Sequence, residues 1–189
     1  MRKKEWRVYG RKADFNGLGK ELGISPLTVR IMCNRDVRTG EEMSKYLHPD
    51  RKNLYDPLLM KDMKKAAEIL VEKIRQHKKI RIMGDYDIDG VTSVAILMEG
   101  MGNLGADVDW YIPNRVADGY GMNMRMVENA INDGVDTIIT CDNGISARDE
   151  VTYAKEDGLT VVVTDHHDVP ETGVPNADAV VDPKQEDCT

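Results

Sequence analysis

The sequence predicts an α/β fold: a mostly parallel five-stranded sheet with helices on both faces, preceded by a helical N-terminal segment. After Lys79 the chain has five short apolar runs of strand length, and helix-length stretches separate the first four. Strands that alternate with helices form βαβ units, which favours a parallel sheet. The expected strands are Ile80–Met83, Val108–Ile112, Thr137–Cys141, Thr160–Val163 and Ala179–Val181, and the expected helices cover about residues 91–102, 123–132 and 146–157.

Residues 1–79 are expected to form a separate helical and basic leader, followed by a domain over residues 80–189. Ser25 and Pro26 are typical of a helix start, and Thr39 with Glu42 forms a capping box. Apolar residues at three- and four-residue spacing after Met60 predict an amphipathic helix that ends near residue 77.

The charge of the chain is unevenly distributed. Residues 1–79 contain 20 Lys and Arg against 11 Asp and Glu, a net charge of +9, whereas residues 80–189 contain 6 against 22, a net charge of −16; together they give −7. A basic leader on an acidic body can hold a polyanion while leaving carboxylates free for metal. The same charges would also fit a solvated helical surface.

Several features favour a cytoplasmic protein with no membrane segment. The longest purely apolar run, Val94–Met98, is too short to span a bilayer, and no apolar stretch typical of a signal peptide follows the basic start. The three cysteines form no C-x-x-C pair, which is typical of reduced thiols in the cytoplasm.

Acidic and histidine residues follow three of the expected strands. They are Asp85, Asp87 and Asp89 after the first strand, Asp142 after the third, and Asp165, His166 and His167 after the fourth. Ligands bind beyond the carboxyl ends of parallel strands, so these groups are expected to meet at one edge. Because their like charges would repel one another, we expect a bound metal pair, for which Mn²⁺, Mg²⁺ or Zn²⁺ suits the mixed oxygen and imidazole donors.

Other motifs in the sequence compete with this interpretation. The segment from Asp85 to Gly90 imitates half of an EF-hand loop, but Ile96 stands where that loop needs its bidentate Glu. The string from Asp87 to Val91 resembles the nucleophile motif of haloacid-dehalogenase phosphatases, which stays as a weaker alternative. The glycines of residues 100–105 match G-x-G-x-x-G, but they end a helix rather than follow a strand, so they indicate a helix stop.

Three motifs in order, G-D-Y-D-I-D-G-V-T-S, C-D-N-G-I-S and V-T-D-H-H-D-V-P, resemble motifs I to III of the DHH phosphoesterase superfamily. The leader and the segments N-L-Y-D-P-L-L-M-K-D-M, I-P-N-R-V-A-D-G-Y-G-M-N and A-D-A-V-V-D-P-K resemble the RecJ-type single-stranded-DNA-specific exonucleases within it. The likeness extends over nearly the whole chain.

The resemblance implies a role for each site residue. Asp87 and Asp89 would bind the two metals, Asp142 would bridge them and act in catalysis, and His166 would be a further ligand. His167 would meet the substrate phosphate, Asp85 would be a ligand or would support one, and Asp165 would orient its neighbours. Arg115 and Tyr120 would contact the nucleic acid. Met83 stands where many relatives have histidine, which puts the affinity of one metal in question.

The implied activity is a metal-dependent phosphodiesterase, a 5′-to-3′ exonuclease that degrades single-stranded DNA in repair and recombination with Mn²⁺ or Mg²⁺ in a two-metal site. DNA-repair proteins are the implied partners. The alternatives are another DHH hydrolase, acting on nanoRNA, a cyclic dinucleotide or pyrophosphate, and a non-catalytic DNA-binding scaffold. The resemblance also implies that a fourth acidic motif and a DHHA1 domain follow Thr189, and that the fragment alone has low activity.

Overall fold

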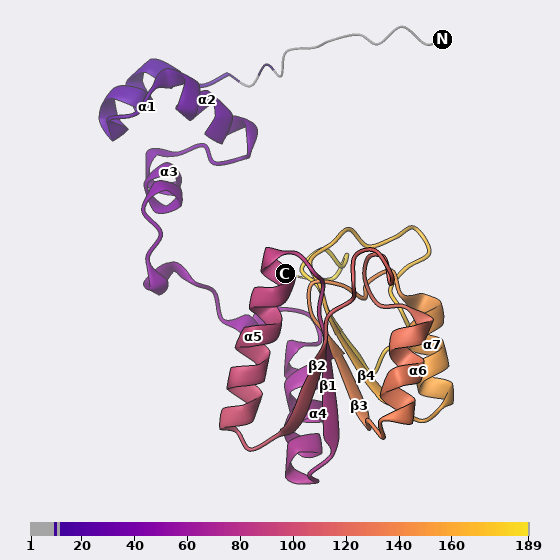
Figure 1. The fold of residues 1–189 in the computed structure, drawn as a ribbon. Helices are drawn as coiled ribbons and strands as arrows, with labels where there is room; N and C mark the ends of the chain where they lie inside the picture. Colours follow the sequence, from indigo (N-terminus) through magenta and orange to yellow (C-terminus); the bar gives the residue numbers. More distant parts are fainter. Residues whose placement is uncertain (1–9, 11, 189) are drawn as a thin grey trace, which may run out of the picture. The chain divides into compact units, whose positions relative to one another are not determined.

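The computed structural model describes Gly10 and residues 12–188, and the chain forms two compact units (Figure 1). We call Met1–Tyr55 the N-terminal unit and Asp56–Thr189 the sheet unit. The start of the expected basic leader, residues 1–9 together with residue 11, lies outside the described residues.

The sheet unit contains five parallel strands in the order β2-β1-β3-β4-β5. Their bounds are Lys79–Met83 (β1), Asp107–Tyr111 (β2), Thr137–Thr140 (β3), Thr160–Thr164 (β4) and Ala179–Val181 (β5). The expected five-stranded α/β sheet is confirmed, and all of its strand pairs are parallel.

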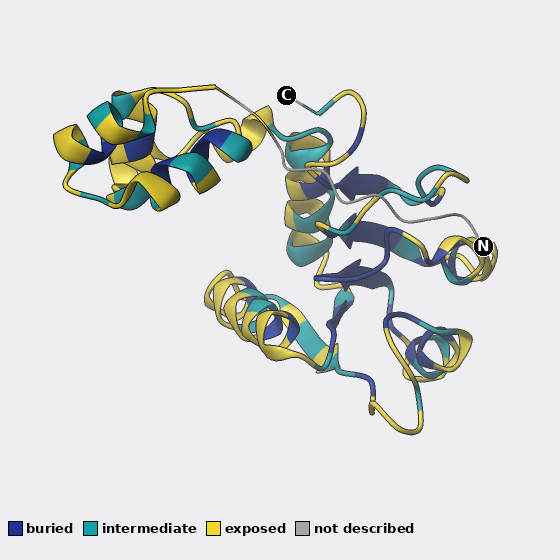
Figure 2. Cartoon of the chain, turned by 90° about the horizontal axis from the view of Figure 1, so that it is seen from above, coloured by how far each residue is buried: buried dark blue, intermediate teal, exposed yellow. Residues whose placement is uncertain are grey.

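Helices cover both faces of this sheet (Figures 1 and 2). α4 (Met63–Arg75) and α5 (Ile88–Asn103) cover one face, and α6 (Met124–Asn132) and α7 (Arg148–Glu156) cover the other. Gly105, at φ 79°, follows the end of α5, so the G-x-G-x-x-G match is a helix stop as the sequence indicates.

Successive strand residues point to opposite faces and so divide the core in two. Ile80 and Ile82 pack with α4 and α5, whereas Met83 packs with α6 and α7. Val162 and its neighbours Val161 and Val163 divide in the same way. Burial on both faces explains why these strands are continuous apolar runs rather than alternating ones.

The N-terminal unit contains α1 (Phe15–Leu22), α2 (Pro26–Asn34) and α3 (Gly40–Leu47), followed by the short 3₁₀ helix η1 (Arg51–Asn53). Ser25 caps α2, and the capping box of Thr39 with Glu42 is present at α3. Sequence reasoning missed α1, because Gly17 and Gly19 lower the helix propensity of that segment.

The boundary between the units differs from the one that the sequence predicts. The sequence predicts α4 as part of the leader, but its Ala66 is buried in the core under the sheet, with Met63 and Leu70 packed beside it. Asp62, just before α4, accepts a hydrogen bond from the backbone N–H of Val180 in β5 at 3.1 Å. The structure therefore places the boundary between Tyr55 and Asp56, before the short 3₁₀ helix η2 (Pro57–Leu59), and not at 79/80.

Within the part of the chain that the structure describes, no helix is both long enough and apolar enough to cross a membrane.

A buried arginine joins the two strands at one edge of the sheet. The Arg81 side chain in β1 is only 7% exposed, and its guanidinium donates two hydrogen bonds of 2.7 Å to Asp109, its register partner in β2. Asp133, after α6, lies 2.9 Å from the same guanidinium. Burial alone would raise the pKa of Asp109, but Arg81 and Lys79 more than offset it and hold that pKa below its ordinary value.

We expect Asp109→Asn to lower the free energy of unfolding by about 1–2 kcal/mol at neutral pH, because Arg81 loses a charged bidentate partner that is itself one-third exposed. The folded-state pKa of Asp109 is depressed, so its contribution is present above the ordinary carboxyl pKa of about 3.9 and is lost as the pH falls through the lower folded value. Urea denaturation from neutral to acidic pH measures both effects.

Asp107→Asn, an exposed carboxylate on the same strand, is the matched control. Equal unfolding free energies for the two variants at neutral pH would contradict a stabilising role for the Arg81–Asp109 pair.

Candidate metal centre

The strand order creates a crevice at the carboxyl ends of β1 and β3. The chain passes from β1 to β2 on one side and later adds β3 on the other side of β1. Connections that leave neighbouring strands in opposite directions open a crevice between them, and in this sheet order the crevice lies at β1 and β3. The loops after β1 and β3 both end in it.

The loop after β1 contributes Asp85 and Asp87. Asp85 is fully buried, and neither of its carboxylate oxygens has a hydrogen-bond partner among the described residues. Asp87 caps α5 by accepting the backbone N–H of Gly90 at 3.2 Å. A side chain at Gly90 would place its Cβ 2.6 Å from the Asp85 carbonyl oxygen, so glycine is needed for α5 to begin this close to the loop.

The loop after β3 contributes Asp142, which is 7% exposed and adopts a left-handed backbone conformation with φ 61°. The next residue, Asn143, holds this loop against β1, because its side-chain amide donates to the carbonyl oxygens of Met83 and Cys141, each at 3.0 Å. Burial, followed by the negative charges of Asp89 and Asp87, raises the pKa of Asp142 to about 6.

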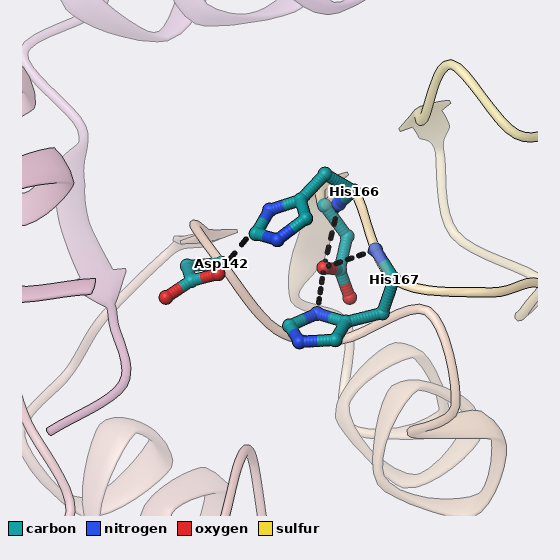
Figure 3. Close-up of side chains that lie close together, drawn as sticks. Asp142, His166 and His167 are labelled. Carbon is teal, nitrogen blue, oxygen red and sulfur yellow. Dashed lines mark hydrogen bonds and ion pairs between the residues drawn. The ribbon is translucent and has the colours of Figure 1, made fainter. Parts of the chain in front are cut away.

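The loop after β4 contributes Asp165, His166 and His167, as the close-up in Figure 3 shows for the two histidines. Asp165 Oδ1 accepts the backbone N–H groups of both histidines, at 2.7 and 3.2 Å, and lies 2.7 Å from His167 Nδ1. Its Oδ2 accepts the backbone N–H of Ile145 at 2.9 Å. The hydrogen bond to Asp165 raises the pKa of His167. Asp165 thus fixes the loop and the His167 ring.

These loops form two groups of metal-ligand atoms that share one residue. Asp85, Asp87 and Asp142 form one group, and Asp142, Asp165, His166 and His167 form the other. Within each group the ligand atoms lie within 4.8 Å of one another. His166 Nδ1 is 3.3 Å from Asp142 Oδ1 (Figure 3). Buried carboxylate oxygens without partners, set beside imidazole nitrogens, fit Mn²⁺ or Mg²⁺, and Asp142 stands where a shared ligand would lie.

Asp89 belongs to neither group of ligand atoms, but it lines the same pocket as Asp142 and His166. It is exposed in the first turn of α5, although its charge raises the pKa of Asp142. Met83, at the end of β1, packs into the core beside α6 and α7 and offers no imidazole.

A row of rings extends from the metal groups to the loop after β2. The Tyr120 hydroxyl lies 2.9 Å from His167 Nε2, and its ring contacts that of Tyr86 edge-on at 6.2 Å. Arg115 lies over the Tyr86 ring at 5.4 Å. Burial, followed by the charge of Asp85, raises the pKa of Tyr120 to about 12, so the phenol stays protonated. Sequence reasoning missed Tyr86, whose signal is its position between two acidic residues of the first loop.

Sequence reasoning also missed Asp182, which follows β5 at the same edge of the sheet. It is fully buried; its Oδ1 accepts the backbone N–H of Lys184 at 2.7 Å, and its Oδ2 has no partner among the described residues. Burial raises its pKa, and the charge of Asp165 adds to this effect. Its position at a strand end was the signal that could have found it.

We expect Asp142→Asn to weaken Mn²⁺ binding at least about tenfold in isothermal titration calorimetry, because it removes the charge that both ligand groups share. Asparagine tolerates the left-handed backbone of this position, so the loop is preserved. Asp168→Asn is the matched control, since that carboxylate lies in the neighbouring ligand loop after β4 but is 93% exposed and pairs with Lys184 at 2.8 Å. Unchanged Mn²⁺ stoichiometry and affinity in Asp142→Asn would contradict the shared role.

The chain resembles known exonucleases in sequence. It is 40% identical over 188 residues to the single-stranded-DNA-specific exonuclease RecJ of Bacillus subtilis (strain 168), a match that covers 99% of this chain and 24% of the relative. It is 43% identical over 129 residues to the RecJ of Thermus thermophilus, covering 66% of this chain and 19% of the relative. The chain thus spans about a quarter or less of the length of these relatives.

Solved structures and a family model agree with the sequence matches. A crystal structure of exonuclease RecJ bound to manganese has a TM-score of 0.66 and 40% identity, covering 72% of this chain and 34% of that one. The RecJ of Thermus thermophilus in complex with Mn²⁺ has a TM-score of 0.66 and 32% identity, covering 93% and 24%. The model described as "DHH family, N-terminal domain" matches residues 79–189, which contain the sheet and all three ligand loops. The chain therefore belongs to the DHH family.

Proposed function

We propose that this chain carries metal-binding residues of a phosphodiesterase that removes nucleotides from the 5′ end of single-stranded DNA. The observation that carries the proposal is Asp142, a buried carboxylate shared by two groups of ligand atoms at the crevice between β1 and β3. The relatives described as single-stranded-DNA-specific exonucleases support the choice of substrate. Membership of the DHH family removes the haloacid-dehalogenase alternative.

The ligand residues would divide between two cations. Asp85 and Asp87 would hold one side of the site, His166 the other, and Asp142 both. Asp89, in the first turn of α5, would be a further metal ligand. Its negative charge already raises the pKa of Asp142. Bound Mn²⁺ or Mg²⁺ supplies Lewis acidity and lowers the pKa of a water that attacks phosphorus. No side chain of the protein has to act as the nucleophile.

His167 would bind the scissile phosphate. Its Nδ1 is held by Asp165 at 2.7 Å, and this hydrogen bond raises the pKa of the ring and so favours the positively charged form. The opposite nitrogen, Nε2, contacts the Tyr120 hydroxyl at the edge of the site. A phosphate oxygen that approaches this edge would therefore meet a cationic N–H group and a phenol.

The aromatic rings of Tyr86 and Tyr120, with Arg115 beside them, would hold the DNA strand next to the cations. Unstacked bases of single-stranded nucleic acids bind to aromatic side chains, and an arginine contributes phosphate contacts and stacking. Tyr86, Tyr120 and Arg115 provide both kinds of group.

We also propose that the protein is cytoplasmic and that its partners are DNA-repair proteins, because an enzyme that degrades single-stranded DNA acts where DNA is repaired.

We expect Mn²⁺-dependent release of 5′-terminal nucleotides from single-stranded DNA by a chimera in which this chain replaces the matched segment of the Bacillus subtilis relative. Asp142→Asn and His166→Ala in this chimera should each slow the release at least about a hundredfold, because they remove metal ligands. Binding of the strand should change little, since phosphate contacts elsewhere carry most of the affinity.

Asp168→Asn again serves as the control and should leave the rate close to that of the unchanged chimera. Full cleavage by both ligand variants would contradict the metal assignment, and equal cleavage of duplex DNA would contradict the substrate assignment.

A further inference from the structure

A small pocket adjoins the groups of metal-ligand atoms. Its volume is about 240 Å³, and the loops after β2, β3 and β4 line it together with the first turn of α7. Tyr120 and His167, whose side chains lie 2.9 Å apart, both line it, and His167 also belongs to the second ligand group. A nucleotide whose phosphate meets His167, as in the proposed function, therefore has this pocket within reach of its base.

The walls of the pocket suit the flat faces of a ring. Met122, Ile145 and Ala147 line it and are buried in the core that packs with α6 and α7. The rings of Tyr120 and His167 stand edge-on to each other, with their centroids 5.9 Å apart. Unstacked bases of a single strand bind to apolar and aromatic surfaces of this kind.

The polar side chains of the pocket offer hydrogen-bond acceptors. Glu150, in the first turn of α7, is half-buried, and its carboxylate has no hydrogen-bond or ion-pair partner among the described residues. Asn143 is 2% exposed, and its Nδ2 donates to two backbone carbonyl groups, whereas its Oδ1 has no partner within the described part of the chain. A buried acceptor without a partner is unfavourable, so the pocket favours a ligand that brings N–H donors.

These acceptors decide which part of a nucleotide fits. A phosphate in the pocket would face the carboxylates of Glu150 and Asp165, and like charges at short range repel. A base is neutral. Cytosine, adenine and guanine carry an exocyclic amino group that donates hydrogen bonds, whereas thymine presents carbonyl oxygens and a methyl group instead. A base with an amino group therefore satisfies the pocket better than thymine does.

We propose that this pocket binds one base of the single strand and prefers bases with an exocyclic amino group to thymine, with Glu150 as the acceptor that selects them. The proposal rests on the proposed nuclease function, because that function places the strand at His167. The selection itself needs no cation, since neither Glu150 nor Asn143 belongs to the two groups of ligand atoms.

Fluorescence anisotropy with the whole chain and labelled oligo-dC and oligo-dT, at pH 8 with EDTA, tests the proposal. The unchanged chain should bind oligo-dC at least about fivefold more tightly, which is the discrimination of one well-paired base. Glu150→Ala should abolish this preference. The matched control is Asp149→Ala, an exposed neighbour in the same turn that does not line the pocket, and it should keep the preference. Both variants lose one negative charge, so the ratio of the two affinities cancels the general effect of charge on DNA binding.

Circular dichroism melting shows whether each variant is folded. If Glu150→Ala is not, Glu150→Gln should still reduce the preference, because an uncharged amide oxygen is a weaker acceptor than a carboxylate. Equal affinities of the unchanged chain for the two strands would overturn the proposal. So would an equal preference in Glu150→Ala and Asp149→Ala, or no measurable binding of oligo-dC.

The result is distinguishable from failure of the proposed nuclease function, because EDTA removes the cations and no cleavage is measured. A preference for oligo-dC without Mn²⁺-dependent cleavage in the chimera would contradict the nuclease function alone. Cleavage by the chimera without any base preference in this chain would contradict the pocket alone.

Discussion

The main constraint on this structure is the mutual repulsion of the carboxylates that the strand order places in one crevice. Asp85 and Asp142 are both buried there, with Asp87 and Asp89 close enough to raise the pKa of Asp142. Buried like charges are unfavourable without a counter-charge, so a cation between them stabilises the arrangement. The local features of the loops, such as the amide of Asn143 that joins β3 to the end of β1, keep these charges together.

The proposed binding of DNA has to overcome the negative charge of residues 80–189. Residues 80–189 carry a net charge of −16, which would repel DNA at long range. In the proposed function, cations at the crevice, the His167 ring held by Asp165, and Arg115 over Tyr86 would supply positive charge where the phosphate would lie. The basic residues of the chain are concentrated before residue 80, so the proposed function assigns the attraction of DNA and the chemistry at the crevice to different segments.

The sequence predicts the sheet well because its signals are local. All five strands lie where apolar runs predict them, since a strand buried on both faces needs an unbroken run, and the acidic strand ends meet because parallel strands share one carboxyl edge. The failures come from tertiary contacts. Because α4 packs on the sheet, the boundary between the units lies before α4 and not after it. The contact of Gly19 with the turn that follows requires a small residue in α1, and glycine lowers the helix propensity on which the prediction of α1 depends. The burial of Asp182 follows from the folded arrangement and not from the local sequence.

The free energy of unfolding of Asp142→Asn, measured at pH 8 with EDTA and with saturating Mn²⁺, tests the central claim most directly. A folded-state pKa of about 6, raised above the ordinary carboxyl value, means that ionised Asp142 destabilises the metal-free fold above that pH. In EDTA the variant should therefore be more stable than the unchanged chain, by about 1–3 kcal/mol. Mn²⁺ should stabilise the unchanged chain by at least about 1.4 kcal/mol more than the variant, because the variant lacks the shared ligand and binds the ion at least about tenfold more weakly. Equal stability in EDTA, or equal stabilisation of both chains by Mn²⁺, would contradict the account.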